Sequence, residues 1–251
     1  MNARTTMAIA NTILFLAVLV VNFLANALPI NGMNTGEVSD LYPSLFTPSG
    51  VTFSIWSIIY LLLFAFVIYQ WKLRDRSYFS LLSKLFMLSC LLNASWILVW
   101  HNLLPAVSVL IMVLFLLVLI RLFRLVHHIQ LESQQEYYMI RLPFTLYLSW
   151  ICVATIANLA AWLTSLQIVD SILTQEVLTV VMMLVAAALA IVVVLRFRDY
   201  AFPAVTIWAL AGIALKRLEV ITPAAIAIAL ALAGVILFHG VRSKGARKSA
   251  S

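Results

Sequence analysis

Charge is the scarcest property of this 251-residue chain, since only 10% of its residues are charged and 65% are hydrophobic. A soluble domain is about a quarter charged and about half apolar. A globular core cannot hide so much apolar surface, so lipid must be the solvent for much of it. The composition therefore excludes an ordinary soluble protein.

Cysteine is also scarce, and both Cys90 and Cys152 fall inside apolar runs. A disulfide inside a bilayer is disfavoured and no Cys and His spacing indicates a metal, so both are expected to be buried thiols. No HExxH motif, phosphate-binding loop, Ser/His/Asp arrangement or pair of intramembrane acids occurs. These absences predict a protein that is not an enzyme and requires no cofactor.

The dominant feature that is present is a series of eight apolar runs. Each is roughly 17–25 residues long, as a membrane-spanning helix requires, whereas barrel strands would be about 10 residues and would alternate in polarity. The sequence therefore predicts an all-α integral membrane protein. The expected spans are Met7–Ile30, Val51–Trp71, Leu81–His101, Pro105–Phe123, Leu142–Leu163, Ser171–Leu195, Ala201–Lys216 and Ile221–His239. The seventh is the shortest, so a seven-span chain is the alternative.

The basic residues indicate the orientation of these spans. Lys and Arg collect in short cytoplasmic loops. Thirteen of the 16 basic residues fall in alternate segments. This alternation predicts an even number of spans with both termini in the cytoplasm. The expected location is the cell (plasma or inner) membrane. These basic residues are Arg4, Lys72, Arg74, Arg76, Arg121, Arg124, Arg141, Arg196, Arg198, Arg242, Lys244, Arg247 and Lys248. Because they are scattered, the net charge of +7 does not indicate nucleic acid. Membrane lipid is the expected partner of the basic tail.

Two connections and a change in composition divide the chain. The connection from Asn31 to Gly50 has no basic residue and is expected outside, as a lid or as a plain connector. In the Arg121–Arg141 connection, the preceding helix is expected to continue, which would place His128 and Glu132 one turn apart. The pair would then be part of a solvated helix face or, alternatively, half of a metal site. After residue 165 the spans are rich in Ala, Val, Leu and Ile. We expect a bundle over residues 1–165 and an accessory three-helix module over 166–251.

Tryptophans recur at helical spacing in the second, third and fifth spans. In the fifth span, successive steps of four residues drift by only about 40° around a helix, which gives one slanting stripe. An Asn facing lipid is costly, so the stripe should face the bundle interior. The stripe consists of Trp150, Ala154, Asn158 and Trp162.

The other three helices also present inner faces. Residues at i, i+3 and i+7 share one face of a helix. The second span has Phe53, Trp56 and Tyr60, the third has Asn93, Trp96 and Trp100, and the first has Asn11, Asn22 and Asn26. Together such faces would suit a large, flat, mostly apolar ligand. The alternative is that the asparagines only bond neighbouring helices and that Trp71, Trp100 and Trp162 are membrane-interface residues.

The motifs of three helices resemble the tryptophan-rich sensory protein family, which includes the mitochondrial translocator protein, or peripheral-type benzodiazepine receptor. The matching residues are Pro48, Phe53, Trp56 and Tyr60 in the second span; Leu92, Asn93 and Trp96 in the third; and Pro143, Phe144, Trp150, Ala154, Asn158 and Trp162 in the fifth. The resemblance covers about residues 1–165. The chain departs from the family pattern at Thr47 and Gly50, at Phe144, where the usual aromatic residue of the family is Tyr, and by its extra helices.

The resemblance implies a five-helix bundle that binds porphyrins or haem, and in some members sterols or synthetic aromatic ligands, and that is often a homodimer. The expected ligand-binding residues are Asn26, Phe53, Trp56, Tyr60, Asn93, Trp96, Tyr147, Trp150, Ala154, Asn158 and Trp162. Sensing or transport of such a ligand is the function that the resemblance favours. An uncoupled facilitator for a small apolar solute and light-dependent porphyrin breakdown are the alternatives.

Overall fold

The computed structural model describes residues 2–28, 30–168, 171–216 and 219–248, with side chains as far as Val241, and these residues form helices and no strand. The long helices are α1 (Ala3–Ala27), α3 (Ile55–Leu73), α4 (Phe79–His101), α5 (Pro105–His128), α7 (Leu142–Ser165), α8 (Ile172–Phe197), α9 (Ala201–Ala214) and α10 (Ile221–Lys248). The short ones are η1 (Ile30–Gly32), α2 (Thr35–Asp40), η2 (Gly50–Ser54), α6 (Gln134–Glu136) and η3 (Tyr137–Arg141).

The lengths of these helices confirm an all-α membrane protein. Within the described ranges, seven helices are long and apolar enough to cross a bilayer, and α9 is a shorter apolar helix. The 14 residues of α9 extend about 21 Å at 1.5 Å per residue, less than the roughly 30 Å of a hydrocarbon core. The seventh predicted span, Ala201–Lys216, is therefore shorter than the hydrocarbon core of a bilayer is thick. The side chains of Arg242, Lys244, Arg247 and Lys248, used above for orientation, lie outside the described residues.

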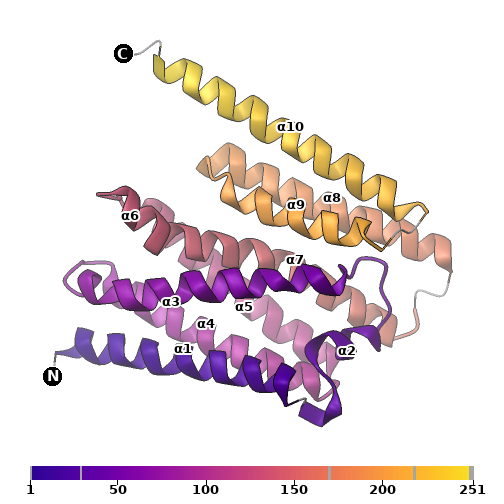
Figure 1. Cartoon of the computed structure of the whole chain (residues 1–251), viewed down its shortest axis with the longest axis horizontal. Helices are drawn as coiled ribbons and strands as arrows, with labels where there is room; N and C mark the ends of the chain where they lie inside the picture. Colours follow the sequence, from indigo (N-terminus) through magenta and orange to yellow (C-terminus); the bar gives the residue numbers. More distant parts are fainter. Residues whose placement is uncertain (1, 29, 169–170, 217–218, 249–251) are drawn as a thin grey trace. The chain divides into compact units, whose positions relative to one another are not determined.

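The chain forms two compact units, and the first comprises residues 1–43 and 55–166. In this unit α1 packs on α4, α4 on α5, α5 on α7, α7 on α3 and α3 on α1, so the five long helices close into a ring. Figure 1 shows these helices, coloured from indigo to rose, running alongside one another. Each helix therefore has one side toward the ring interior, and the inward side chains decide how the helices pack.

Phenylalanine fills one level of the ring interior. Phe66 of α3 meets Phe144 of α7 with ring centroids 4.9 Å apart and Phe86 of α4 at 5.1 Å, both edge to face. Phe15 of α1 adds to this layer, with its ring centroid 6.1 Å from that of Phe86. All four side chains are buried. Edge-to-face pairs of this kind stabilise a core beyond the area they bury.

A polar network lies beside this layer and joins three helices. The fully buried Asn11 of α1 donates from Nδ2 to Gln70 Oε1 of α3 at 2.7 Å and to Ser83 Oγ of α4 at 3.1 Å. Gln70 Nε2 in turn donates to the Ala8 carbonyl oxygen at 3.2 Å and to Thr12 Oγ1 at 3.3 Å. Hydrocarbon offers no alternative partner for these amides. The network therefore fixes the rotation of α1 and α3 about their axes.

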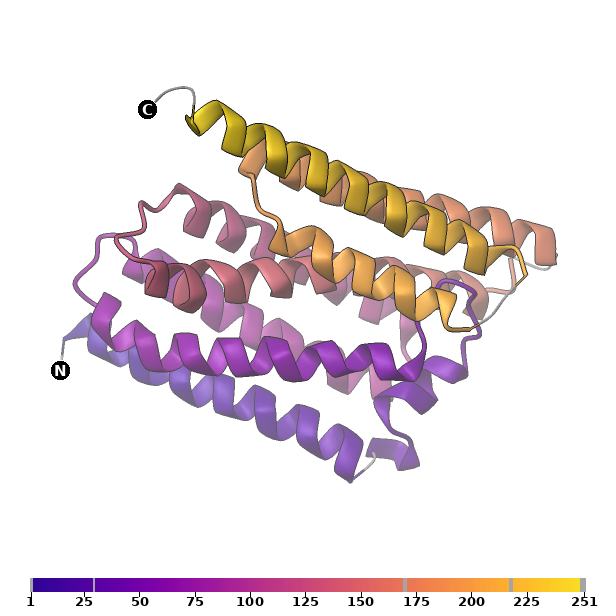
Figure 2. The ribbon, with the colours of Figure 1, turned by 45° about the horizontal axis from the view of Figure 1, so that its top comes forward.

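Three helices of the second unit pack on one another. This unit comprises residues 44–54 and 167–251, and α8, α9 and α10 are all in mutual contact. Figure 2 shows this part in orange to yellow, with α10 and α8 alongside α9. Ser44–Ser54, from the first connection, belongs to this unit because it packs on α9. The division of the chain into domains at residue 165 or 166 stays a prediction.

The Arg121–Arg141 connection differs from the expected continuous helix. Helix α5 ends at His128, and the next residue, Ile129, is extended. His128 and Glu132 are therefore not one turn apart, so the expected continuation of the helix is wrong and the alternative of half a metal site loses its basis. No group of three or more potential metal-ligating side chains occurs in the part of the chain that the structure describes.

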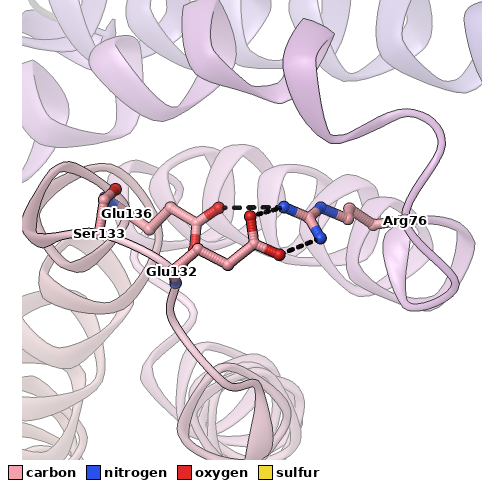
Figure 3. A network of polar contacts seen from close by, with 4 residues as sticks. All are labelled: Arg76, Glu132, Ser133 and Glu136. Carbon is pink, nitrogen blue, oxygen red and sulfur yellow. Dashed lines mark hydrogen bonds and ion pairs between the residues drawn. The ribbon is translucent and has the colours of Figure 1, made fainter.

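Glu132 instead belongs to an ion-pair network with Arg76, which lies between α3 and α4. Arg76 makes two hydrogen bonds with the Glu132 carboxylate and reaches Glu136 Oε1 at 3.6 Å. Figure 3 shows both carboxylates facing the guanidinium, with Ser133 next to Glu136. The hydrogen bonds from Arg76, and then its charge, lower the pKa of the Glu132 carboxyl. Two connections distant in sequence are joined by this network.

Replacing Gln70 with Leu should lower the free energy of unfolding by about 1–2 kcal/mol, because the buried Asn11 amide loses the nearer of its two acceptors. Thermal unfolding followed by circular dichroism in detergent measures this loss. Gln135→Leu, at an exposed glutamine, is the control. The Asn11→Leu/Gln70→Leu double variant should recover much of the stability, since both buried partners are then apolar. Equal stability of Gln70→Leu and the control would contradict the structural role of this network.

Replacing Glu132 with Gln should lower the melting temperature slightly near neutral pH. Because the folded pKa of Glu132 is lowered, the ion pair stabilises the protein above the ordinary range for Glu and is lost as the pH falls through the folded pKa. The difference from wild type should therefore vanish in acid and shrink at high salt, since both residues are exposed to solvent. Asp75→Asn removes an exposed carboxylate next to Arg76 and serves as the control. A pH-independent difference would argue against this pairing.

Candidate functional site

Four aromatic rings from α3 and α7 converge inside the five-helix unit. Trp56 stacks on Tyr60, one turn further along α3, with ring centroids 5.2 Å apart and an interplanar angle of 20°. The edges of Tyr147 and Trp150, on α7, meet Trp56 at centroid distances of 6.0 and 6.3 Å. We call Trp56, Tyr60, Tyr147 and Trp150 the aromatic cluster. Trp150 and Tyr147 are each only 2% exposed, whereas Trp56 and Tyr60 are half-buried.

Asn93 of α4 is the polar centre next to this cluster. Its Nδ2 donates to the Tyr147 hydroxyl at 3.0 Å and to the Tyr60 hydroxyl at 3.5 Å, and its Oδ1 accepts from Asn22 Nδ2 at 2.8 Å. The side chain of Asn93 is fully buried. One amide thus links α1, α3, α4 and α7. It holds the two phenol rings of the cluster in fixed orientations.

A second aromatic pair lies further along α4. Trp96 and Trp100 stack with ring centroids 6.1 Å apart, and both are buried. Trp100 Nε1 donates to the Thr35 carbonyl oxygen at 3.4 Å, whereas the buried Nε1 of Trp96 has no hydrogen-bond partner among the described residues. An unpaired buried N–H costs about 1–3 kcal/mol. Trp96 therefore offers a donor to any acceptor that reaches it.

Residues 30–42 cover the end of α4 at this pair. The fully buried His101 has Thr35 Oγ1 at 3.1 Å from Nε2 and the Ile30 carbonyl oxygen at 3.4 Å from Nδ1. Asn31 Nδ2 donates to the His101 carbonyl oxygen at 2.9 Å, and the Tyr42 ring lies 5.8 Å from that of Trp100. Burial also raises the pKa of the Tyr42 hydroxyl. Trp100 is therefore covered by the protein, and its interpretation as a membrane-interface residue is wrong.

Helix α2 owes its place in this cover to a capping box. Asn34 Oδ1 accepts from the backbone N–H groups of Gly36 and Glu37, and the Glu37 carboxylate accepts from Asn34 N at 2.7 Å. Such reciprocal bonds satisfy donors that a short helix would leave exposed. The cap begins α2 at Thr35, whose carbonyl and hydroxyl both bond the end of α4.

The stripe on α7 divides between two roles. Trp150 belongs to the aromatic cluster, while the buried Asn158, about two turns further on, accepts a hydrogen bond from Ser108 of α5. Asn158 therefore joins α7 to α5. Ala154 and Trp162 are half-buried on the same face.

Two predicted site residues lie apart from this arrangement. Asn26 is exposed, and its Nδ2 donates to the Asn22 carbonyl oxygen on its own helix at 2.8 Å. Phe53 lies in η2, which belongs to the second unit. Spacing on a helical wheel placed Asn26 on the same face as Asn22, but α1 is covered less near its end.

Several polar residues in these contacts were not among the predicted site residues. Asn22 was predicted to lie on the inner face of the first span but not to bind the ligand. Its hydrogen bond to Asn93 makes it part of the polar centre next to the aromatic cluster. Gln70, at the end of the predicted second span, could have been found as an amide inside an apolar run. Ser108, Thr35 and His101 carried no such signal, because single hydroxyls and a histidine at a span end are common in membrane helices.

The comparisons with known proteins address the family of the chain. Neither the curated proteins nor the solved structures gave a match. A family model described as TSPO-like protein matches residues 8–240. The match extends through the last three helices, well beyond the 1–165 range covered by the motif resemblance, so these helices are part of the family pattern. The chain thus belongs to the TSPO-like protein family, as a multi-pass helical membrane protein with buried aromatic clusters.

Proposed function

We propose that the protein binds a flat, hydrophobic aromatic ligand, a tetrapyrrole such as a porphyrin or haem or a molecule of similar shape, for sensing or transport. The convergence of Trp56, Tyr147 and Trp150 on one another is the observation that carries this proposal. Indole and phenol rings provide large apolar faces and edges on which a planar ligand stacks. Trp56 is only half-buried, so part of its ring remains available for contact.

Polar groups next to the rings support a ligand with acceptor atoms on an apolar body. Binding sites of this kind are mostly apolar and use a few polar groups to set orientation. Asn93 holds the Tyr60 and Tyr147 hydroxyls beside the rings. Trp96, three residues after Asn93 on the same face of α4, contributes a buried N–H that a carboxylate or carbonyl of the ligand would satisfy.

The distribution of acids favours binding or uncoupled movement over ion-coupled transport. Proton- or sodium-coupled carriers usually place carboxylates near the middle of the membrane. The described carboxylates of this chain lie in connections or near helix ends, at Glu37, Asp40, Asp75, Glu132, Glu136, Glu176, Asp199 and Glu219. The ligand is thus expected to move without a coupling ion, if it moves at all.

For the topology, we infer that the chain crosses the membrane eight times and that both termini lie in the cytoplasm. The membrane is inferred to be the plasma or inner membrane of the cell. Alternation of the basic segments supports an even number. Helix α9 is short, but a membrane accommodates a short span by local thinning or by snorkelling of flanking residues. Lys216, two residues after α9, is suited to that role.

A titration with protoporphyrin IX tests ligand binding directly. Saturable quenching of tryptophan fluorescence is expected with the purified protein in lipid nanodiscs. Trp150→Phe should weaken binding about 2–10-fold, as expected for loss of about 0.5–1.5 kcal/mol of ring contact. Trp71→Phe, at an exposed tryptophan, is the matched control and should bind like wild type. Absence of saturable quenching in the wild type would reject the proposed function.

The polar centre is tested by Asn93→Leu. We expect this change to lower protoporphyrin affinity and also the free energy of unfolding by about 1–3 kcal/mol, because three interhelical hydrogen bonds are lost. Asn26→Leu makes the same substitution at an exposed position whose amide bonds only its own helix, and it should change neither quantity. The measurements are the dissociation constant by fluorescence and thermal unfolding. If Asn93→Leu binds protoporphyrin with unchanged affinity, the Asn93 amide does not contribute to the ligand site.

A further inference from the structure

Ser44–Ser54 is held by two polar contacts with α9 and by a third with Lys216, just after this helix. Ser49 N donates to the Gly212 carbonyl oxygen at 3.0 Å. Trp208 Nε1 donates to the Thr52 carbonyl oxygen at 2.9 Å. Lys216 Nζ donates to the Ser44 carbonyl oxygen at 3.3 Å. The acceptors and donors of the segment are main-chain groups, so α9 fixes its backbone.

Gly212 allows this close approach. A Cβ atom at Gly212 would lie 2.0 Å from Thr52 Oγ1 and 2.7 Å from Thr52 Cγ2, which is far inside van der Waals contact. Thr52 is fully buried, and its Oγ1 lies 3.2 Å from Ser49 Oγ. Any side chain at position 212 must therefore displace η2 or α9. By contrast, a Cβ at Gly234 of α10 would meet nothing within 4 Å.

The segment leads directly into the helix that carries the first ring of the aromatic cluster. Thr52 lies within η2, which ends at Ser54, and α3 begins at Ile55. Trp56 is the second residue of α3, four residues after Thr52 along a continuous helical path. A shift of η2 at Thr52 is therefore transmitted through about one turn of helix to Trp56.

The hydrogen bonds at Thr52 lie where they can affect the start of α3. Residues at the start of a helix lack intrahelical partners for their N–H groups, so the first turn is the least constrained part of a helix. Here the bond between Thr52 N and Ser49 O and the bond from Trp208 to Thr52 O constrain the chain just before that turn. The entry direction of α3, and with it the position of the Trp56 ring, depends on these bonds.

We propose that α9 is a positioning element for Trp56, in which Gly212 and Trp208 fix the start of α3 and so set the affinity of the aromatic cluster for its ligand. The claim about affinity rests on the proposed function. The claim that α9 fixes the start of α3 rests only on the contacts above. The short helix of the second unit thereby acquires a role that its Ala-rich sequence does not suggest.

The test compares Gly212→Ala with Gly234→Ala in the full-length protein in nanodiscs. Both variants place the same methyl group in a helix, but only the first meets Thr52. Hydrogen–deuterium exchange of the amides in residues 50–60 should rise in Gly212→Ala and stay at the wild-type level in Gly234→Ala. Protoporphyrin IX affinity should fall several-fold in the first variant alone. Equal exchange in the two variants overturns the inference whether or not the wild type binds porphyrin.

A second variant separates positioning from folding. Trp208→Phe keeps a ring on α9 and removes the donor to Thr52 O, and Trp71→Phe is its control. Higher exchange in residues 50–60 and weaker binding, at an unchanged melting temperature, are expected for Trp208→Phe. Should Gly212→Ala not fold, this variant decides the question. Raised exchange with unchanged affinity would overturn the claim that α9 sets ligand affinity. If the wild type does not bind protoporphyrin IX, the proposed function is rejected. The exchange data then still decide whether α9 fixes the start of α3.

Discussion

Hydrocarbon supplies no hydrogen-bond partners, and this constraint determines how the five-helix unit is put together. Each buried amide of the unit must find its partners on another helix or on its own backbone. Asn93 does so through Nδ2 and Oδ1, with Tyr147, Tyr60 and Asn22, and Asn11 does so through Nδ2, with Gln70 and Ser83. Because each bond joins two different helices, the bonds set the rotation of one helix against the next. The aromatic rings are directed inward as a consequence.

The polar bonds and the aromatic contacts thus have different roles. Leu, Ile and Val pack against each other or against lipid at similar free energy, so apolar contact alone specifies helix rotation poorly. The Asn93 amide removes that ambiguity at the level of Trp56 and Trp150. The Phe66, Phe86 and Phe144 layer then fills the interior at another level with edge-to-face contacts. Together these contacts make a rigid frame, which would keep the cost of ordering low for the flat ligand proposed above.

Much of the fold follows from the sequence, because a spanning helix is recorded in a single run of apolar residues. The starts at Pro105, Leu142 and Ile221 were predicted at the observed residues, and proline near the first position of α5 and α7 explains two of them. The stop of α5 at His128 was missed. No Gly or Pro marks that end, and the ion pairs of Glu132 with Arg76, distant in sequence, hold the connection that follows.

The candidate site was predicted in part, for a related reason. Helical spacing places Trp56 and Tyr60, or Trp150 and Asn158, on one face, but it does not say which neighbour that face meets. Asn158 meets Ser108 of α5, whereas Trp150 meets Trp56 of α3. Helical spacing placed Trp100 on the inner face, whereas its place near a helix end left the membrane interface as the alternative, and only the cover formed by residues 30–42 decides for burial. Such outcomes depend on contacts between segments far apart in the chain, which no local pattern contains.

The same limit applies to the boundary between the bundle and the last helices. A change of composition after Leu163 suggests an accessory module, yet Ser44–Ser54 packs with α9, about 160 residues later in the chain. The main-chain groups of Ser49 and Thr52 find their partners there. Removing the last helices would leave these groups without partners just before α3. The family match likewise extends over the last helices, as far as residue 240.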